Sequence, residues 1–97
     1  VGATEVPLDI MRTAAACVEH ADFLAHNGSR MARSDAGVSV AFVRAAVDGA
    51  SLNVYINAAS IDDAERAARY RDEADRLVAQ TREHCDEVFA FVKDAVS

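Results

Sequence analysis

Helix-breaking residues are scarce in this chain, and that scarcity constrains its fold more than any other feature of the sequence. The single proline is Pro7, and three of the four glycines, Gly28, Gly37 and Gly49, lie downstream of it. Long segments can therefore stay helical, because proline and glycine are the residues that most destabilise a helix interior. No alternation of apolar and polar residues typical of a half-buried strand is evident. The chain is predicted to be all-α.

The first helix is predicted to run from Leu8 to Ala25. Pro7 suits a first helical turn, where its missing N–H has no partner to lose. Asn27 and Gly28 form a stop signal of the kind that allows a positive φ after the last turn, so residues 27–33 are expected to be a loop. Apolar residues at three- and four-residue steps are expected to face the core, namely Ile10, Ala14, Cys17, Ala21 and Leu24.

The second helix is predicted to begin at Ser34 as N-cap, with Asp35 in its first turn near the positive end of the helix dipole. It continues to about Asn57. On a helical wheel its polar residues share one narrow arc, and nearly everything else is apolar or small; the arc holds Arg44, Asp48, Ser51 and Tyr55. Such a helix is expected to be central in the fold, and Gly49 in its interior suggests close packing.

Two asparagines, Asn53 and Asn57, fall on the apolar side of this second helix, in the same direction as Phe42 and Gly49. Burying an amide without partners costs roughly 1–3 kcal/mol. Each amide is therefore expected to meet polar groups from another helix, a ligand or water. A hydrogen bond between helices that fixes their register is the structural alternative to ligand binding.

The third helix is predicted to start after a capping box at Ser60-Ile61-Asp62-Asp63 and to run to the C-terminus, a length on the order of 50 Å. Its core-facing stripe is predicted to be Ala64, Ala67, Arg71, Ala74, Val78, Thr81, Cys85, Phe89, Val92 and Val96. Arg71 is the charged member of that stripe, and its guanidinium requires a carboxylate partner or a route to solvent. The whole chain, residues 1–97, is thus predicted to be a single helical domain of three helices.

Composition excludes several classes of function. A net charge of -6 without a Lys/Arg cluster argues against nucleic-acid binding. No apolar stretch approaches the roughly 20 residues of a membrane span. No secretory signal is visible, and two cysteines without repeated spacing favour reduced thiols and a cytoplasmic location. The His and Cys spacings match no zinc motif, so no metal is expected.

Several segments together resemble one family. Val6-Pro7-Leu8, Asn27-Gly28, Ser34-Asp35, Val38, Ala45-Ala46, Gly49-Ala50, Asn53-Val54, Ile56-Asn57 and Ile61-Asp62-Asp63 are similar to the second half of the cyclodeaminase/cyclohydrolase domain of the formiminotransferase-cyclodeaminase family. The most specific stretches are Ser34-Asp35 and residues 53–57. The resemblance implies chemistry on one-carbon units of tetrahydrofolate, either cyclodeamination of formiminotetrahydrofolate or hydrolysis of methenyltetrahydrofolate.

The resemblance also implies roles for individual residues. Asn53 and Asn57 are expected to bind the pterin, Ser34 to bind substrate, Asp35 to act as catalytic acid or base, and Arg71 to clamp the glutamate tail. The structural alternatives are a helix cap for Ser34 and Asp35 and an ion pair between helices for Arg71.

The family domain is considerably longer than this chain, and its missing first half carries a Gly-rich segment and an acidic proton-transfer residue. The chain is accordingly expected to be an incomplete half of a larger helical bundle. Three alternatives account for the missing half: truncation or proteolysis, supply of that half by another chain, or a shortened homologue that no longer catalyses. A homo-oligomer or a complementary helical chain is expected to cover the remaining apolar surface. A non-catalytic helical interaction domain is the alternative function.

Overall fold

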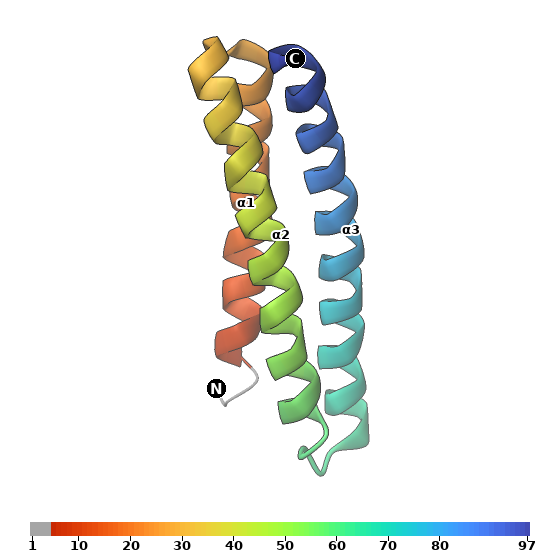
Figure 1. Cartoon of the computed structure of the whole chain (residues 1–97). Coiled ribbons are helices and arrows are strands. Elements are labelled where there is room, and N and C mark those ends of the chain that lie inside the picture. Colours follow the sequence, from red (N-terminus) through yellow and green to blue (C-terminus); the bar gives the residue numbers. More distant parts are fainter. Residues whose placement is uncertain (1–4) are drawn as a thin grey trace.

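A computed structural model describes residues 5–97, which form three helices joined by two short turns (Figure 1). The helices are α1 (Glu5–Asn27), α2 (Arg30–Ala58) and α3 (Ala64–Val96). They lie side by side in a bundle measuring 51 × 19 × 16 Å, in which α2 packs against both α1 and α3. Every element within residues 5–97 is a helix, so the all-α prediction is confirmed.

The turn between α1 and α2 is shorter than predicted. Helix α1 ends at Asn27 as expected, but α2 begins at Arg30, so only Gly28 and Ser29 separate the two helices. No glycine among the described residues has a positive φ. The Ser29 side chain accepts a hydrogen bond from the Ala32 N–H at 3.2 Å and is the N-cap of α2. The prediction that Ser34 caps this helix is therefore wrong, since Ser29 satisfies the same requirement one turn earlier.

Substitution of the two serines distinguishes these assignments. Ser29→Ala is expected to lower the free energy of unfolding by about 1 kcal/mol, because it removes the side chain that caps α2. Ser34→Ala is expected to change it by less than about 0.5 kcal/mol, since Ser34 is exposed inside the helix. Urea denaturation followed by circular dichroism measures both values. The reverse order of effects would restore Ser34 as the cap.

The N-terminus of α3 also differs from the predicted capping box. Asp63 itself is the N-cap, and its carboxylate accepts from the N–H groups of Glu65 and Arg66, both at 3.1 Å. Ser60 is not the cap, because its hydroxyl donates to the carbonyl oxygen of Asn57 at 2.9 Å and so closes the end of α2. The predicted capping box does lie at the start of α3, but the residue that caps the helix is Asp63, three residues after Ser60.

The core consists of two clusters along the bundle. One, near the α1–α2 turn and the C-terminus of α3, contains Val18, Ala21, Ala25, Ala36, Val40, Cys85, Val88 and Val92. The other, toward the opposite end, contains Leu8, Met11, Val47, Ala50, Val54 and Ala74. Burial raises the pKa of the Cys85 thiol, in keeping with a structural role in the first cluster.

The predicted core face of α1 is rotated by about one residue from the observed one. Met11 and Val18 are buried, whereas their neighbours Ile10 and Cys17 are exposed. Both candidate faces are apolar, because alanines continue around this helix, so periodicity alone did not distinguish them. Ala21 belongs to both faces and is buried as predicted.

The predicted face of α3 agrees better with the structure. Ala67, Ala74, Thr81, Cys85 and Val92 are buried as expected. Ala64, Arg71 and Phe89 are exposed, so their placement on the core-facing stripe is wrong. None of the three helices is long and apolar enough for a membrane span, within the residues that the structure describes.

Candidate functional site

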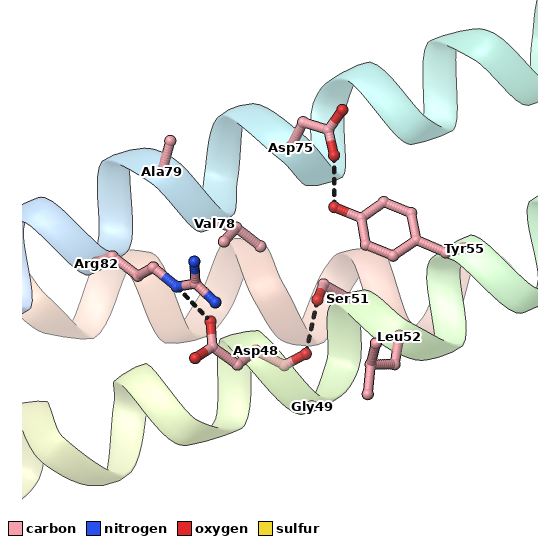
Figure 2. Close-up of a pocket in the computed structure, with 9 residues that line it drawn as sticks. All are labelled: Asp48, Gly49, Ser51, Leu52, Tyr55, Asp75, Val78, Ala79 and Arg82. Carbon is pink, nitrogen blue, oxygen red and sulfur yellow. Dashed lines mark hydrogen bonds and ion pairs between the residues drawn. The ribbon is translucent and has the colours of Figure 1, made fainter.

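An open groove of about 620 Å³ lies between α2 and α3 (Figure 2). Its lining residues are Asp48, Gly49, Ser51, Leu52, Tyr55, Asp75, Val78, Ala79 and Arg82. Helix α2 supplies the first five and α3 the other four. Its polar residues from α2 are Asp48, Ser51 and Tyr55, and they belong to the polar arc predicted from the helical wheel.

The groove residues are bonded to one another across the two helices. Arg82 Nε donates to Asp48 Oδ1 at 3.0 Å, and the Tyr55 hydroxyl donates to Asp75 Oδ1 at 2.5 Å, as Figure 2 shows. The buried Ser51 hydroxyl donates to the Asp48 carbonyl oxygen at 2.6 Å. Asp48 and Tyr55 of the polar arc therefore join α2 to α3, whereas the Ser51 bond lies within α2.

Arg44 adds one more contact between the two helices, because its guanidinium pairs with Asp86 of α3. Exposed pairs of this kind contribute about 0–1 kcal/mol each. Their main effect is on the orientation of α2, because they fix which side of this helix faces α3. The polar side chains along the groove are thus bonded to one another across the interface between α2 and α3.

Tyr55 provides a pH test of this arrangement. Burial, together with the hydrogen bond to Asp75, raises the pKa of Tyr55 to about 12. Because the pKa of Tyr55 is higher in the folded state than its unfolded value of about 10, protonated Tyr55 stabilises the fold fully at pH values below about 10. This stabilisation is lost as the pH rises from about 10 toward 12.

Ultraviolet titration of tyrosinate is expected to show one of the two tyrosines ionising near pH 12. Tyr55→Phe is expected to abolish this late step, whereas Tyr70→Phe is expected to leave it. Absence of a tyrosinate step near pH 12 in the wild-type chain would contradict the Tyr55–Asp75 contact.

The outer face of α2, opposite the core, carries the predicted asparagines. Asn53 is exposed, so the prediction that both amides lie in a buried apolar face is wrong for Asn53. Asn57 is half-buried and interacts with its surroundings. The physical reason is that α2 turns Val47 and Val54 toward the core, which places the face bearing Asn53 and Phe42 outward.

The other predicted site residues are not gathered around these amides. Ser34 and Asp35 are exposed in the second turn of α2. Asp35 and Asn53 point in the same direction but lie eighteen residues apart, about 27 Å along the helix axis. Arg71 is exposed on α3, and within residues 5–97 no hydrogen bond or ion pair holds its guanidinium.

Sequence reasoning missed the α3 partners of the polar arc. Asp75, Arg82 and Asp86 recur at steps of seven and four residues, which places them on one face of a helix. That spacing, matched to the arc on α2, is the signal that could have found them.

Two of the three histidines contact the carboxylate of Asp22. His84 Nε2 lies 2.8 Å from Asp22 Oδ2, and His26 Nδ1 lies 3.0 Å from Asp22 Oδ1. No group of three or more His, Cys, Asp or Glu is arranged to hold a metal ion in the part of the chain described here. The His84–Asp22 contact therefore ties α3 to α1, whereas the His26–Asp22 contact lies within α1.

Comparison with known proteins finds a matching family and a curated relative. The sequence model of the formiminotransferase-cyclodeaminase family matches residues 1–76. A methenyltetrahydrofolate cyclohydrolase of Methylorubrum extorquens (strain AM1) is 34% identical over 95 residues, which cover 98% of this chain and 46% of the relative. The chain thus spans about half the length of the curated relative that it matches.

Proposed function

The chain belongs to the formiminotransferase-cyclodeaminase family, and we propose that it is a folate-handling module. Its substrate would be formiminotetrahydrofolate, which is cyclodeaminated, or methenyltetrahydrofolate, which is hydrolysed to formyltetrahydrofolate. The chain's own contribution is the outer face of α2, which presents amide and carboxylate side chains to the substrate.

The observation that carries this proposal is the placement of Asn53 and Asn57. They lie one turn apart on α2, and Asn53 is open to a ligand while Asn57 is half-buried. An amide both donates and accepts hydrogen bonds, which suits the mixed donors and acceptors along the edge of a pterin. By contrast, the groove between α2 and α3 has its polar groups already paired.

The proposed chemistry needs a proton acceptor and donor near the one-carbon unit. In the hydrolysis, water adds to the methenyl carbon and loses one proton to give a hydroxyl on that carbon. One carbon–nitrogen bond then breaks as this hydroxyl loses its proton to become the formyl C=O, and the released nitrogen takes up a proton. Asp35 is the proposed acid and base for these proton transfers. The net charge of -6 gives no long-range attraction for an anionic folate, so local donors such as Asn53 and the exposed Arg71 must provide recognition.

Binding of methenyltetrahydrofolate, measured by its absorbance and by calorimetry, tests the proposal. Asn53→Ala and Asn57→Ala are each expected to weaken binding at least tenfold, about 1.4 kcal/mol, while leaving the helical circular dichroism unchanged. Asn27→Ala is the matched control, because the Asn27 amide bonds only within α1, to the Phe23 carbonyl oxygen. Equal affinity in all three variants would remove these asparagines from the site.

A non-catalytic interaction domain is the second candidate. The exposure of five large apolar side chains on α2 favours it, as does the distance between Asp35 and Asn53 within one chain. Turnover separates the candidates: a folate module hydrolyses methenyltetrahydrofolate faster than buffer does, and Asp35→Asn slows that reaction. An interaction domain associates without turnover.

A further inference from the structure

A hollow between α1 and α3 is lined in part by polar side chains that the fold leaves without partners. Its volume is about 330 Å³. Both helices contribute to its lining, which consists of Ala15, Ala16, Val18 and Glu19 from α1 and of Gln80, Thr81 and His84 from α3. The hollow is therefore distinct from the α2–α3 groove, whose lining comes from a different pair of helices.

Thr81 is the clearest indication that this hollow binds something. Its side chain lines the hollow and the residue is only 3% exposed. Within the described residues, the Thr81 Oγ1 atom is buried and has no hydrogen-bond partner. A buried hydroxyl that gives up water without gaining another partner is unfavourable, and native folds rarely contain one. A ligand group that hydrogen-bonds to Thr81 inside the hollow removes this penalty.

Glu19 and Gln80 add two more unpaired polar groups. Both side chains are exposed, and no hydrogen bond or ion pair holds either of them within residues 5–97. His84 differs, because its Nε2 atom lies 2.8 Å from Asp22 Oδ2 and the ring is thus already paired. The hollow is the reverse of the α2–α3 groove, where the polar side chains are bonded to one another.

The charges around the hollow favour a cation. Among the described residues that line it there is no lysine or arginine, whereas Glu19 carries a negative charge and Asp22 adds a second carboxylate as the partner of His84. The net charge of -6 adds a long-range attraction for cations. The unpaired groups can all accept hydrogen bonds, since hydroxyl, amide and carboxylate oxygens are acceptors.

We propose that this hollow binds a small primary alkylammonium ion. An ammonium group carries three N–H donors and no acceptor, which suits the three acceptors Thr81, Gln80 and Glu19. The alkyl chain lies against the apolar side chains of Ala15 and Val18. A water molecule takes up about 30 Å³ in the liquid, so a hollow of about 330 Å³ has room for a chain of several carbon atoms.

Other small ligands fit the hollow less well. An anion would meet the negative charge of Glu19, and like charges repel. A neutral alcohol can pair with Thr81 but leaves the charge of Glu19 without a partner. Asn53 and Asp35 do not line the hollow, so the site is separate from the outer face of α2 and does not rest on the proposed function.

NMR titration of the ¹⁵N-labelled chain with n-butylammonium chloride, at constant ionic strength, tests the proposal. Saturable chemical-shift changes are expected at the backbone amides around Glu19 and Thr81. The uncharged 1-butanol and the anionic butyrate, which carry the same alkyl chain, are each expected to bind at least about fivefold more weakly. Absence of saturable changes at these amides, or equal affinity for 1-butanol, would overturn the proposal.

Thr81→Val separates a contact with the ligand from a role in packing, because valine has nearly the same shape without the hydroxyl. In the ligand-free chain it is expected to raise the midpoint of urea denaturation, since it removes an unpaired buried hydroxyl. It is also expected to weaken butylammonium binding about fivefold. Thr13→Val, at an exposed position of α1, is the matched control and is expected to leave the affinity unchanged. A lower midpoint for Thr81→Val would mean that the fold already satisfies this hydroxyl, and would overturn the proposal.

A second pair of variants tests the charge. Glu19→Gln is expected to weaken butylammonium binding about threefold. Glu83→Gln changes the net charge equally at an exposed position of α3 outside the hollow, and is expected to leave binding unchanged. Equal losses in the two variants would show general attraction without a site, and would overturn the proposal. Butylammonium binding by a chain that does not bind methenyltetrahydrofolate would support this site and count against the proposed function alone.

Discussion

Replacing Met11 by alanine is expected to lower the free energy of unfolding by about 2–5 kcal/mol. Met11 is fully buried and packs in the cluster that joins α1 to α2 and α3. The loss combines the transfer of a large apolar side chain with the cavity that it leaves. A domain of this size has only about 5–15 kcal/mol of total stability, so the variant should unfold well below the wild-type temperature.

Ile10 is the matched control for that variant because it is the neighbouring residue and is 51% exposed. Ile10→Ala is expected to lower the free energy of unfolding of the isolated subunit by less than about 1 kcal/mol. Chemical denaturation of both variants, at a concentration where the chain is dissociated, compares them directly. A larger loss for Ile10 than for Met11 would mean that α1 is rotated by one residue from its described orientation.

Replacing Gly37 by leucine is expected to destabilise the bundle by about 1–3 kcal/mol or more. Gly37 is buried where α2 crosses the C-terminal part of α3, and a Cβ atom on it would lie 2.9 Å from Val92 Cγ1 and 3.3 Å from Val92 Cβ. Valine cannot easily move away, since it is branched at Cβ and is itself buried. The two helices must therefore separate to admit the new side chain.

A second substitution assigns this effect to the contact with Val92. Val92→Ala in the Gly37→Leu chain is expected to recover part of the lost stability, although Val92→Ala alone is destabilising. Ser39→Leu, at an exposed position of α2, is expected to change stability little. Additive losses in the Gly37–Val92 double variant would show that the two residues are not in contact.

Helix content and helix number followed from the sequence because breakers are rare and polar caps stand near each end. The wrong predictions for the N-cap of α2 and the buried face of α1 have a common cause. In each case the sequence offers two alternatives of similar energy. Ser29 and Ser34 are both competent N-caps, and the short turn of Gly28 and Ser29 after α1 places Ser29 in that role. Met11 and Ile10 both lie on apolar stripes, and only packing against α2 selects Met11.

The candidate site was predictable only in part, since its parts lie on different helices. The polar arc on α2 was visible on a helical wheel, but its meaning depended on Asp75 and Arg82, which sit on α3. The direction of Asn53 was also predictable, whereas its exposure was not. Local sequence sets the angular position of a side chain on its helix, and the neighbouring helices determine whether that face is covered.

The central claim is that the outer face of α2 is the functional surface of this chain and that its asparagines contact the folate. A two-dimensional NMR titration of the uniformly ¹⁵N-labelled chain with methenyltetrahydrofolate tests it most directly. Chemical-shift changes are expected at the side-chain amides of Asn53 and Asn57 and at the backbone around Asp35, with the groove residues Asp75 and Arg82 unaffected. Shift changes confined to the α2–α3 groove, or none at saturating ligand, would contradict it.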